Sequence, residues 1–445
     1  MPGFCLLINL KKGAVMNGYL KTVQEILGYI EKSPTAYHVI FNLAERLRKE
    51  GFTRLSEGDE WTLESGKKYY VERNGSSLIA FYVPVTGFDG FNIIASHSDS
   101  PCLKLKEAPE IRKDGYTRLN AEKYGGLVLS SWFDRPLGIA GRIFIRNEGG
   151  ELEERLVDLD DVLVIPSQAP HLNKEINEGF KISVQKDMFP VFSDGEDEMG
   201  VLQRLAKQEY ISESDILGSD LFVYVKEGYS IWGGNGQFIS SPRLDDQECV
   251  WCSLAGFLKS EESGKVRVLS VFDNEEVGSG TKQGALSTFL ADVLTRINLS
   301  LGRSTEQLYT ALARSFMISA DNAHALHPAG MDKYDPVIHP KMNDGIVLKF
   351  SARQSYTTDG RSAALIRLIC SDNDIPVQTF VNHSDNPGGS TLGNLANRHV
   401  SIDTADIGLA QLSMHSAYET AGTLDIYSLI KLSRAFYEID KYVQF

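Results

Sequence analysis

The chain has 445 residues, 42% of them hydrophobic and 23% charged, with a formal net charge of −14. That length can bury a large core and is enough for two domains, and the composition is typical of a soluble globular protein. The negative charge argues against nucleic acid or an anionic membrane as the main partner. No apolar run approaches the ~18–20 residues of a transmembrane helix, so we expect no membrane span. The five cysteines form an odd, sparse set, which indicates reduced thiols and an intracellular, cytoplasmic location.

The first part of the chain predicts two helices and a hairpin. In residues 1–15 a short apolar segment precedes positive charge, the reverse of a secretory signal, and we assign this extension no function. Apolar residues recur at helical spacing over about 18–32 and again over about 36–50. Residues 67–85 alternate around Asn74-Gly75, which predicts a β-hairpin with its turn at that pair.

The middle of the chain differs in character from the segments on either side of it. It contains turn residues, few helical periods and several short β-like runs. We expect strands over 127–130, 139–145, 162–165 and 221–225. We interpret residues 102–234 as an all-β domain inserted into a discontinuous domain made of residues 16–101 and 235–445.

The last part of the chain alternates between strand and helix patterns. The predicted strands cover 266–272, 316–320, 346–350 and 377–381, and the predicted helices cover 286–299, 361–370 and 426–442. Ser304 and Gln307 have capping-box spacing at the start of a further helix. This alternation predicts an α/β fold with a mostly parallel sheet flanked by helices. Cys249 and Cys252 lie on one face of a predicted helix, so we interpret them as buried structural cysteines.

In the discontinuous domain, five segments end an apolar run with side chains of the types that bind metals. These side chains are His97 and Asp99, Asp245 and Asp246, Glu275 and Glu276, Asp321 and His324, and His415. Imidazole and carboxylate ligands without thiolates favour Zn, Mn or Co. In an open α/β sheet the carboxyl ends of the strands share one edge, where ligands bind. The five segments can therefore converge on one metal site.

Several alternatives stay open at the level of residue types. A Glu-Glu pair on its own is most often a solvated acidic turn, so Glu275 and Glu276 gain meaning only from the other four segments. Of Asp245 and Asp246, one is expected to be a metal ligand and the other a helix N-cap. His324 and His327, which follow Asp321, could also be ligands by residue type.

The five segments, taken in order, resemble the successive motifs of the aspartyl aminopeptidase family. The matching stretches are His-Ser-Asp-Ser-Pro-Cys at 97–102, Arg-Leu-Asp at 243–245, Asp-Asn-Glu-Glu-Val-Gly-Ser at 273–279, Ile-Ser-Ala-Asp-Asn-Ala-His-Ala at 318–325 and Gln-Leu-Ser-Met-His-Ser at 411–416. Members of this family, which includes the yeast vacuolar aminopeptidase, are dinuclear-zinc exopeptidases. The resemblance implies a zinc-exopeptidase fold, an inserted dimerisation domain over 102–234, and dimers that assemble into a tetrahedral dodecamer.

The resemblance also implies a set of metal ligands. Asp245 would bridge two divalent ions, with zinc as the first expectation and manganese or cobalt as substitutes. His97 and Asp321 would complete one ion, and Glu276 and His415 the other. On this pattern His324 lies outside the ligand set.

Two further residues are expected to take part in catalysis. Glu275 would act as the general base toward the attacking water, and Asp99 would hold the His97 imidazole in one tautomer. The implied activity is removal of N-terminal residues from peptides, with acidic residues preferred. The alternatives are a related metal-dependent amidase or deacylase and a non-catalytic assembly or cargo protein. A purely structural metal site would have no need of Glu275 as a base.

The resemblance assigns four residues to the substrate. His171, in the inserted domain, would reach the neighbouring subunit's active site and hold the substrate carbonyl; otherwise it is a local loop histidine. Lys349, followed by Tyr356, would meet the substrate's acidic side chain; otherwise it is a lysine at the edge of a strand. Gly389 lies in a glycine turn before a helix near the substrate. That turn lacks the Gly-Lys pattern of a phosphate-binding loop.

Overall fold

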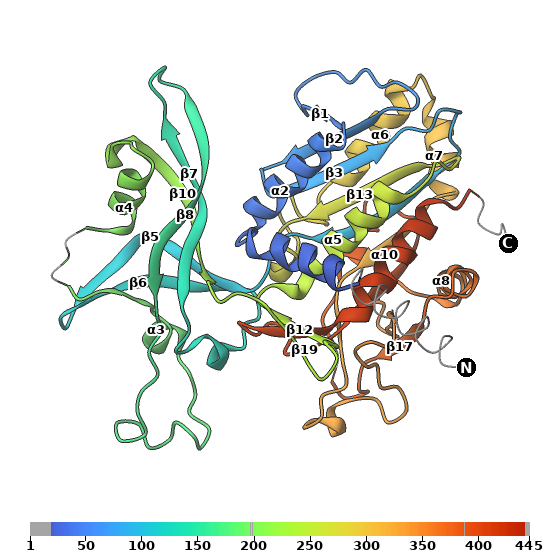
Figure 1. Cartoon of the computed structure of the whole chain (residues 1–445). Helices are drawn as coiled ribbons and strands as arrows, with labels where there is room; N and C mark the ends of the chain where they lie inside the picture. The colour runs from blue at the N-terminus through green and yellow to red at the C-terminus, as the bar shows by residue number, and fades with distance from the viewer. Residues whose placement is uncertain (1–18, 196, 198, 387, 441–445) are drawn as a thin grey trace, which may run out of the picture.

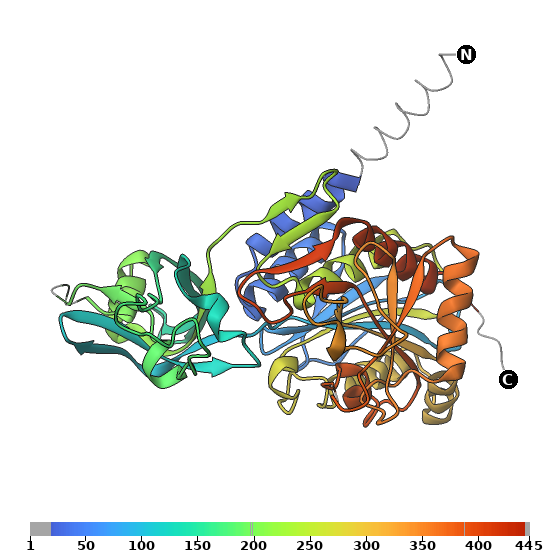
Figure 2. The same cartoon turned by 90° about the horizontal axis from the view of Figure 1, so that it is seen from below.

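The molecule consists of a larger α/β body and a smaller β-rich body that lie side by side (Figures 1 and 2). The computed structural model describes residues 19–195, 197, 199–386 and 388–440. The extension predicted at residues 1–15 lies outside that part of the chain. No helix within it is long and apolar enough to span a bilayer.

The larger body is built on a nine-stranded sheet. In spatial order its strands are β1 (Thr53–Leu55), β2 (Lys68–Arg73), β3 (Ser77–Tyr82), β13 (Val266–Phe272), β4 (Phe91–His97), β14 (Phe316–Ala320), β18 (Asp403–Gly408), β16 (Ile346–Phe350) and β17 (Val377–Val381). The four central strands β13, β4, β14 and β18 run parallel, whereas β3 and β16 run antiparallel to them on either side. The predicted mostly parallel sheet is confirmed.

Helices cover both faces of this sheet (Figure 1). One face carries α2 (Ala36–Lys49), α5 (Leu244–Lys259), α8 (Gly360–Asp372) and α10 (Thr423–Tyr437), and the other carries α6 (Phe289–Ser300), α7 (Thr305–Ala313) and α9 (Leu392–Ala396). Adjacent residues of β4 point to opposite faces, so Ile94 joins the first hydrophobic core and Ile93 the second. Burial on both faces explains why β13, β4 and β14 are rich in apolar residues.

Most of the elements predicted for the larger body are present. The four strands predicted from 266 to 381 have the predicted bounds, and residues 19–31 and α2 match the two N-terminal helices. The hairpin turns at Asn74 and Gly75, which have φ angles of 60° and 64°. Arg73 pairs with Ser77, so the loop has three residues, and the Ser76 N–H donates to the Arg73 carbonyl at 3.3 Å. The helix ends differ from the predictions by a few residues, as expected for frayed termini.

The smaller body is a six-stranded, wholly antiparallel sheet. Its strands are β8 (Leu152–Leu163), β7 (Leu137–Arg146), β10 (Ile216–Val225), β5 (Cys102–Lys113), β6 (Tyr116–Tyr124) and β9 (Val191–Ser193). Two short helices, α3 (Val184–Asp187) and α4 (Val201–Gln208), accompany it. The strand predicted at 127–130 is wrong, because a single 3₁₀ turn (Leu129–Trp132) buries Trp132 in the core of this body. The exact domain boundaries at 102 and 234 stay a prediction.

A third, five-stranded sheet lies at one edge of the larger body. Its strands are β11 (Ser230–Trp232), β12 (Phe238–Ser241), β20 (Glu419–Gly422), β19 (Ala410–Leu412) and β15 (Ala323–His324). The sequence analysis did not predict this sheet. Strand β12 leads into α5, and β19 and β20 form a hairpin whose loop contains His415.

Candidate active site

Acidic and imidazole side chains from five segments meet at one edge of the nine-stranded sheet. His97 ends β4, Asp321 follows β14, and the Glu275–Glu276 pair follows β13 on a single 3₁₀ turn. Because these strands are parallel neighbours, their carboxyl ends lie at the same edge. Asp245 arrives from the start of α5.

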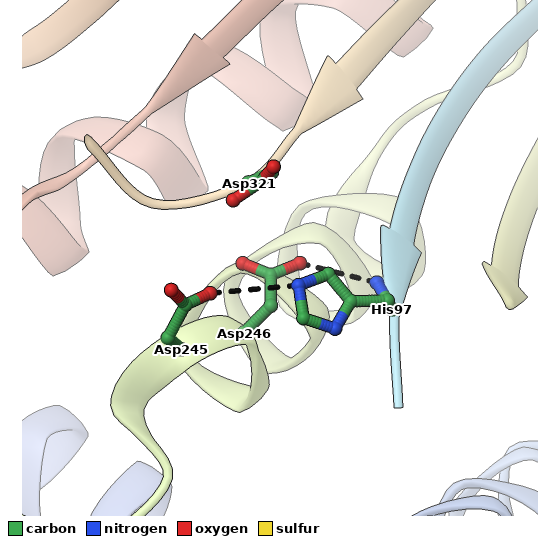
Figure 3. A group of neighbouring side chains, drawn as sticks. All are labelled: His97, Asp245, Asp246 and Asp321. Atoms are coloured by element: carbon green, nitrogen blue, oxygen red, sulfur yellow. Dashed lines mark hydrogen bonds and ion pairs between the residues drawn. The ribbon is translucent and has the colours of Figure 1, made fainter. Parts of the chain in front are cut away.

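The distances around Asp245 define the centre of this cluster. One carboxylate oxygen, Oδ1, lies 3.5 Å from His97 Nε2, and the other, Oδ2, lies 3.9 Å from His415 Nε2. His415 Nε2 is in turn 3.4 Å from Glu276 Oε2. Figure 3 shows Asp245, Asp246 and Asp321 gathered around the His97 ring. The two oxygens of Asp245 therefore face two different histidines.

The cluster offers three overlapping groups of ligand atoms. In each group the atoms lie within 4.8 Å of one another; the groups are His97 with Asp245, Asp246 and Asp321; His97 with Glu275 and Glu276; and Asp245 with Glu276 and His415. All are oxygen or nitrogen donors, which suits zinc.

Several buried carboxylates of the cluster have raised pKa values, and nearby cations would stabilise them as anions. Burial, together with the neighbouring carboxylates, raises the pKa of Glu276 and of Asp321. Burial likewise raises the pKa of Glu275 to about 8, although His97 opposes the shift. Asp245 Oδ1 is buried and accepts no hydrogen bond. Carboxylates that are crowded and desolvated in this way are stable as anions when cations lie between them, so the residues fit a metal centre.

Both histidines of the cluster contact a carbonyl oxygen through Nδ1. His97 Nδ1 is 3.1 Å from the backbone oxygen of Asp99, and His415 Nδ1 is 2.9 Å from that of Gly126. A carbonyl can only accept, so each Nδ1 carries the proton and each Nε2 presents its lone pair to the cluster. This is the tautomer that a metal-ligating imidazole requires.

Comparison with known proteins identifies the family. The family model described as Aminopeptidase I zinc metalloprotease (M18) matches residues 29–437. The chain belongs to the M18 family of zinc metallo-aminopeptidases. Its metal is therefore zinc and its substrates are peptides. The predicted family, the metal and the enzyme class are confirmed.

Individual M18 relatives match nearly the whole chain. A protein of Clostridium novyi (strain NT), a probable M18 family aminopeptidase 2, is 42% identical over 433 residues, which is 95% of this chain and 100% of that protein. The solved structure of the Ape4 and Nbr1 complex has a TM-score of 0.92 and 34% identity, covering 95% of this chain and 86% of that one. The S. cerevisiae mApe1 dodecamer has a TM-score of 0.83 and 29% identity, covering 95% and 97%.

Two residues beside the cluster of candidate ligands make different hydrogen bonds from those expected. Asp246 caps no helix, because its Oδ2 instead accepts the backbone N–H of His97 at 3.1 Å. Asp99 Oδ1 does lie near the His97 ring, 3.4 Å from Nδ1, but the backbone oxygen of Asp99 is closer. The hydrogen bonds of the Asp99 carboxylate go to the backbone N–H groups of Glu275 and Glu276, each at 3.1 Å.

The residues expected to meet substrate lie at different depths. Lys349 is buried beside the M18 cluster, with Nζ 2.8 Å from the Asn322 carbonyl and 3.6 Å from Asp321 Oδ1. Its Nζ also lies 5.5 Å from the centre of the buried Tyr356 ring. Burial opposes its charge, but the Asp321 carboxylate raises the pKa of Lys349 above its usual value, so it is an ammonium ion.

Gly389 and His171 are exposed, as is His324 beside the cluster. His171 lies on the loop between β8 and α3, which extends away from the nine-stranded sheet (Figure 1). Within one chain the structure does not bring it to the cluster. Gly389 precedes Thr391, whose hydroxyl donates to Asp406 Oδ1 at 2.6 Å.

Sequence reasoning missed two buried residues that organise the site. Glu419 accepts the backbone N–H of Asp245 at 3.0 Å and that of His415 at 2.7 Å. Asn322 donates to the Leu244 carbonyl at 3.3 Å and to Gln411 Oε1 at 2.9 Å. The only signal for either was its nearness in sequence to a ligand, because its partners come from segments far away in the chain.

Proposed function

We propose that this M18 enzyme removes N-terminal residues from peptides with a preference for Asp and Glu, using two zinc ions held by five side chains. The observation that supports this best is the pair of Asp245 oxygens, one facing His97 and the other facing His415. A carboxylate placed in this way suits the bridge between two ions. Asp321 would complete the ion on the His97 side, and Glu276 the ion on the His415 side.

In this proposal Glu275 is the general base. When bound, zinc supplies a Lewis acid that polarises the scissile carbonyl and makes water easier to deprotonate. Glu275 would take the proton from the attacking water and return it to the leaving amine. Its backbone N–H is fixed by Asp99, and its carboxylate belongs to the group that includes His97. The base is therefore held by its own main chain next to the reacting atoms.

The preference for acidic residues rests on Lys349. In a site closed to water, a substrate carboxylate binds well only where a cation meets it. The ammonium ion of Lys349 has three donors, of which one is used by the Asn322 carbonyl, so it retains capacity for a substrate oxygen. Tyr356 and the turn containing Gly389 would line the same subsite.

The inserted domain, residues 102–234, is proposed to form dimers that assemble into a dodecamer. The solved mApe1 relative is a dodecamer. The exposed loop position of His171 leaves it accessible to a second subunit, where it would contact the substrate carbonyl. A cytoplasmic location stays a prediction.

A panel of dipeptides tests the proposal. The zinc-loaded enzyme should hydrolyse Asp-Ala and Glu-Ala with higher kcat/KM than Leu-Ala, Ala-Ala and Lys-Ala. Aminoacyl anilides compared with N-acyl amino acids separate an aminopeptidase from an amidase or deacylase, and only the anilides should be cleaved. Preference for neutral or basic N-termini would refute the acidic specificity while leaving the peptidase activity intact.

A further inference from the structure

A three-residue segment of the smaller, inserted β-rich body lies directly against the candidate metal ligands of its own chain. It consists of Tyr124, the last residue of β6, and the two residues that follow, Gly125 and Gly126. The Tyr124 hydroxyl donates to Asp99 Oδ2 at 2.7 Å and accepts from Asn274 Nδ2 at 2.9 Å. Tyr124 thus contacts Asn274, which precedes the Glu275–Glu276 turn, and the Asp99 carboxylate, which accepts the backbone N–H groups of that turn.

The turn that contains Glu275 and Glu276 depends on this outside support. It is a single 3₁₀ turn, preceded by Asn274 at a φ of 61° and followed, after Gly278, by Ser279 at a φ of 56°. Left-handed residues other than glycine cost free energy and persist only where their surroundings fix them. The supports are the Asp99 carboxylate, which accepts both glutamate N–H groups, and the Tyr124 hydroxyl, which orients that carboxylate.

The next two residues of the segment approach two proposed ligands. A Cβ atom on Gly125 would lie 3.1 Å from Glu276 Cβ, and a Cβ atom on Gly126 would lie 3.3 Å from His415 Nδ1. These are tight distances, so glycine allows the backbone to come close. The Gly126 carbonyl uses this approach to accept the His415 Nδ1 proton at 2.9 Å.

We propose that Tyr124, Gly125 and Gly126 form a clamp by which the inserted domain positions the catalytic machinery of its own subunit. Tyr124 acts through Asp99 on the backbone of the glutamate turn, and the Gly126 carbonyl fixes the tautomer of His415. Tyr124 is a positioning residue that touches no reacting atom. The inserted domain therefore has a role in catalysis within its own chain as well as its proposed role in assembly. The inference rests on the proposed roles of Glu275 and His415.

The test of Tyr124 compares two tyrosine-to-phenylalanine variants of the full-length, zinc-loaded enzyme. Tyr124→Phe removes only the hydroxyl. Tyr224→Phe is the matched control, because the Tyr224 hydroxyl donates to Asp158 at 2.8 Å in the same sheet without contacting the glutamate turn. Loss of groups that orient a metal site typically costs about 10- to 100-fold. We expect kcat to fall by about that factor in Tyr124→Phe with KM within about 2-fold, and Tyr224→Phe to match the wild type.

A double-mutant cycle tests the route through Asp99. If Tyr124 acts through this carboxylate, Tyr124→Phe should cost little more in an Asp99→Asn background than Asp99→Asn costs alone. Fully additive losses would overturn the route. Equal kcat for Tyr124→Phe and Tyr224→Phe would overturn the positioning role.

Zinc retention provides a readout that does not depend on the assignment of the base. Gly126→Ala, which crowds His415, should lose zinc to a competing chelator about 10-fold more readily, and the absorption spectrum of its cobalt-substituted form should change. Wild-type retention together with a wild-type spectrum would overturn the clamp. If Glu275→Gln stayed fully active, the proposed base would be wrong, yet the zinc and cobalt measurements would still decide whether the clamp acts on His415.

Discussion

Replacing Glu419 with glutamine should weaken zinc binding although Glu419 is not a proposed ligand. Glu419 is 2% exposed and begins β20. Its two carboxylate oxygens accept the backbone N–H groups of Asp245 and His415, so one side chain links a bridging ligand to a terminal ligand. A glutamine has one acceptor oxygen, and its amide nitrogen would face the second N–H group as another donor.

The size of the effect follows from that mismatch. One hydrogen bond to a charged acceptor, worth about 1.5–3 kcal/mol, is lost. Since about 1.4 kcal/mol corresponds to a tenfold change in an equilibrium constant, zinc affinity should fall by about 10- to 100-fold. Part of the loss should also appear as a lower unfolding temperature, because the two N–H groups are buried with or without metal.

The assay is competition for zinc against a chelator of known affinity, with metal content measured after dialysis. Glu72→Gln is a suitable control, since Glu72 on β2 pairs with the Arg54 side chain at 3.2 Å and not with the backbone of a ligand loop. That variant should bind zinc as the wild type does. Zinc affinity and unfolding temperature both unchanged in Glu419→Gln would refute the idea that backbone hydrogen bonds to this carboxylate hold the ligand loops.

Four further substitutions test the proposed roles. Glu275→Gln should lower turnover by ~10²–10⁴-fold with both metals retained by elemental analysis, because only the base is lost; activity close to wild type would refute the assignment. Asp245→Ala should lose both zinc ions, and unchanged metal content would make Asp246 the first candidate for the bridge. Lys349→Met should lower kcat/KM for Asp and Glu peptides about 30- to 150-fold more than for Leu peptides, which corresponds to about 2–3 kcal/mol for a charge-assisted contact. His171→Phe should lower kcat/KM without metal loss, and mixing it with Glu275→Gln should restore partial activity when subunits exchange; exchange without rescue would exclude a role in trans.

The larger body could be predicted because its elements follow local rules. The strand at 266–272 is mostly apolar and buried on both faces, and its bounds need no knowledge of its neighbours. The inserted sheet was harder to predict. Its longest strands include β5, whose Lys and Glu residues lie half-exposed between buried ones, so charge obscures the apolar period. The third sheet was missed because it joins short strands that are far apart in sequence, such as β12 and β20.

In the site, the ligand-type side chains could be predicted from the sequence, whereas the main-chain contacts could not. Ligand-type side chains can be recognised in a sequence because their chemistry lies in the residue itself. Asp99 lies beside the cluster, but its main hydrogen-bond partners were not predicted, because they are the main-chain N–H groups of Glu275 and Glu276. The Gly126 carbonyl beside His415 is likewise a main-chain group. Such groups occur in almost every residue, and only the folded chain selects among them.

Backbone strain explains why so many buried carboxylates surround the proposed ligands. Arg243 precedes Asp245 with a φ of 58°, Asn274 precedes Glu275 with a φ of 61°, and His415 itself has a φ of 63°. Each left-handed residue costs of order 1–3 kcal/mol, so each ligand loop needs a compensating contact. Glu419 provides it for the first and third loops, and Asp99 with Tyr124 for the second. The site is thus held in its working geometry by hydrogen bonds to the main chain, and removing one of those carboxylates should disturb ligands that it never touches through their side chains.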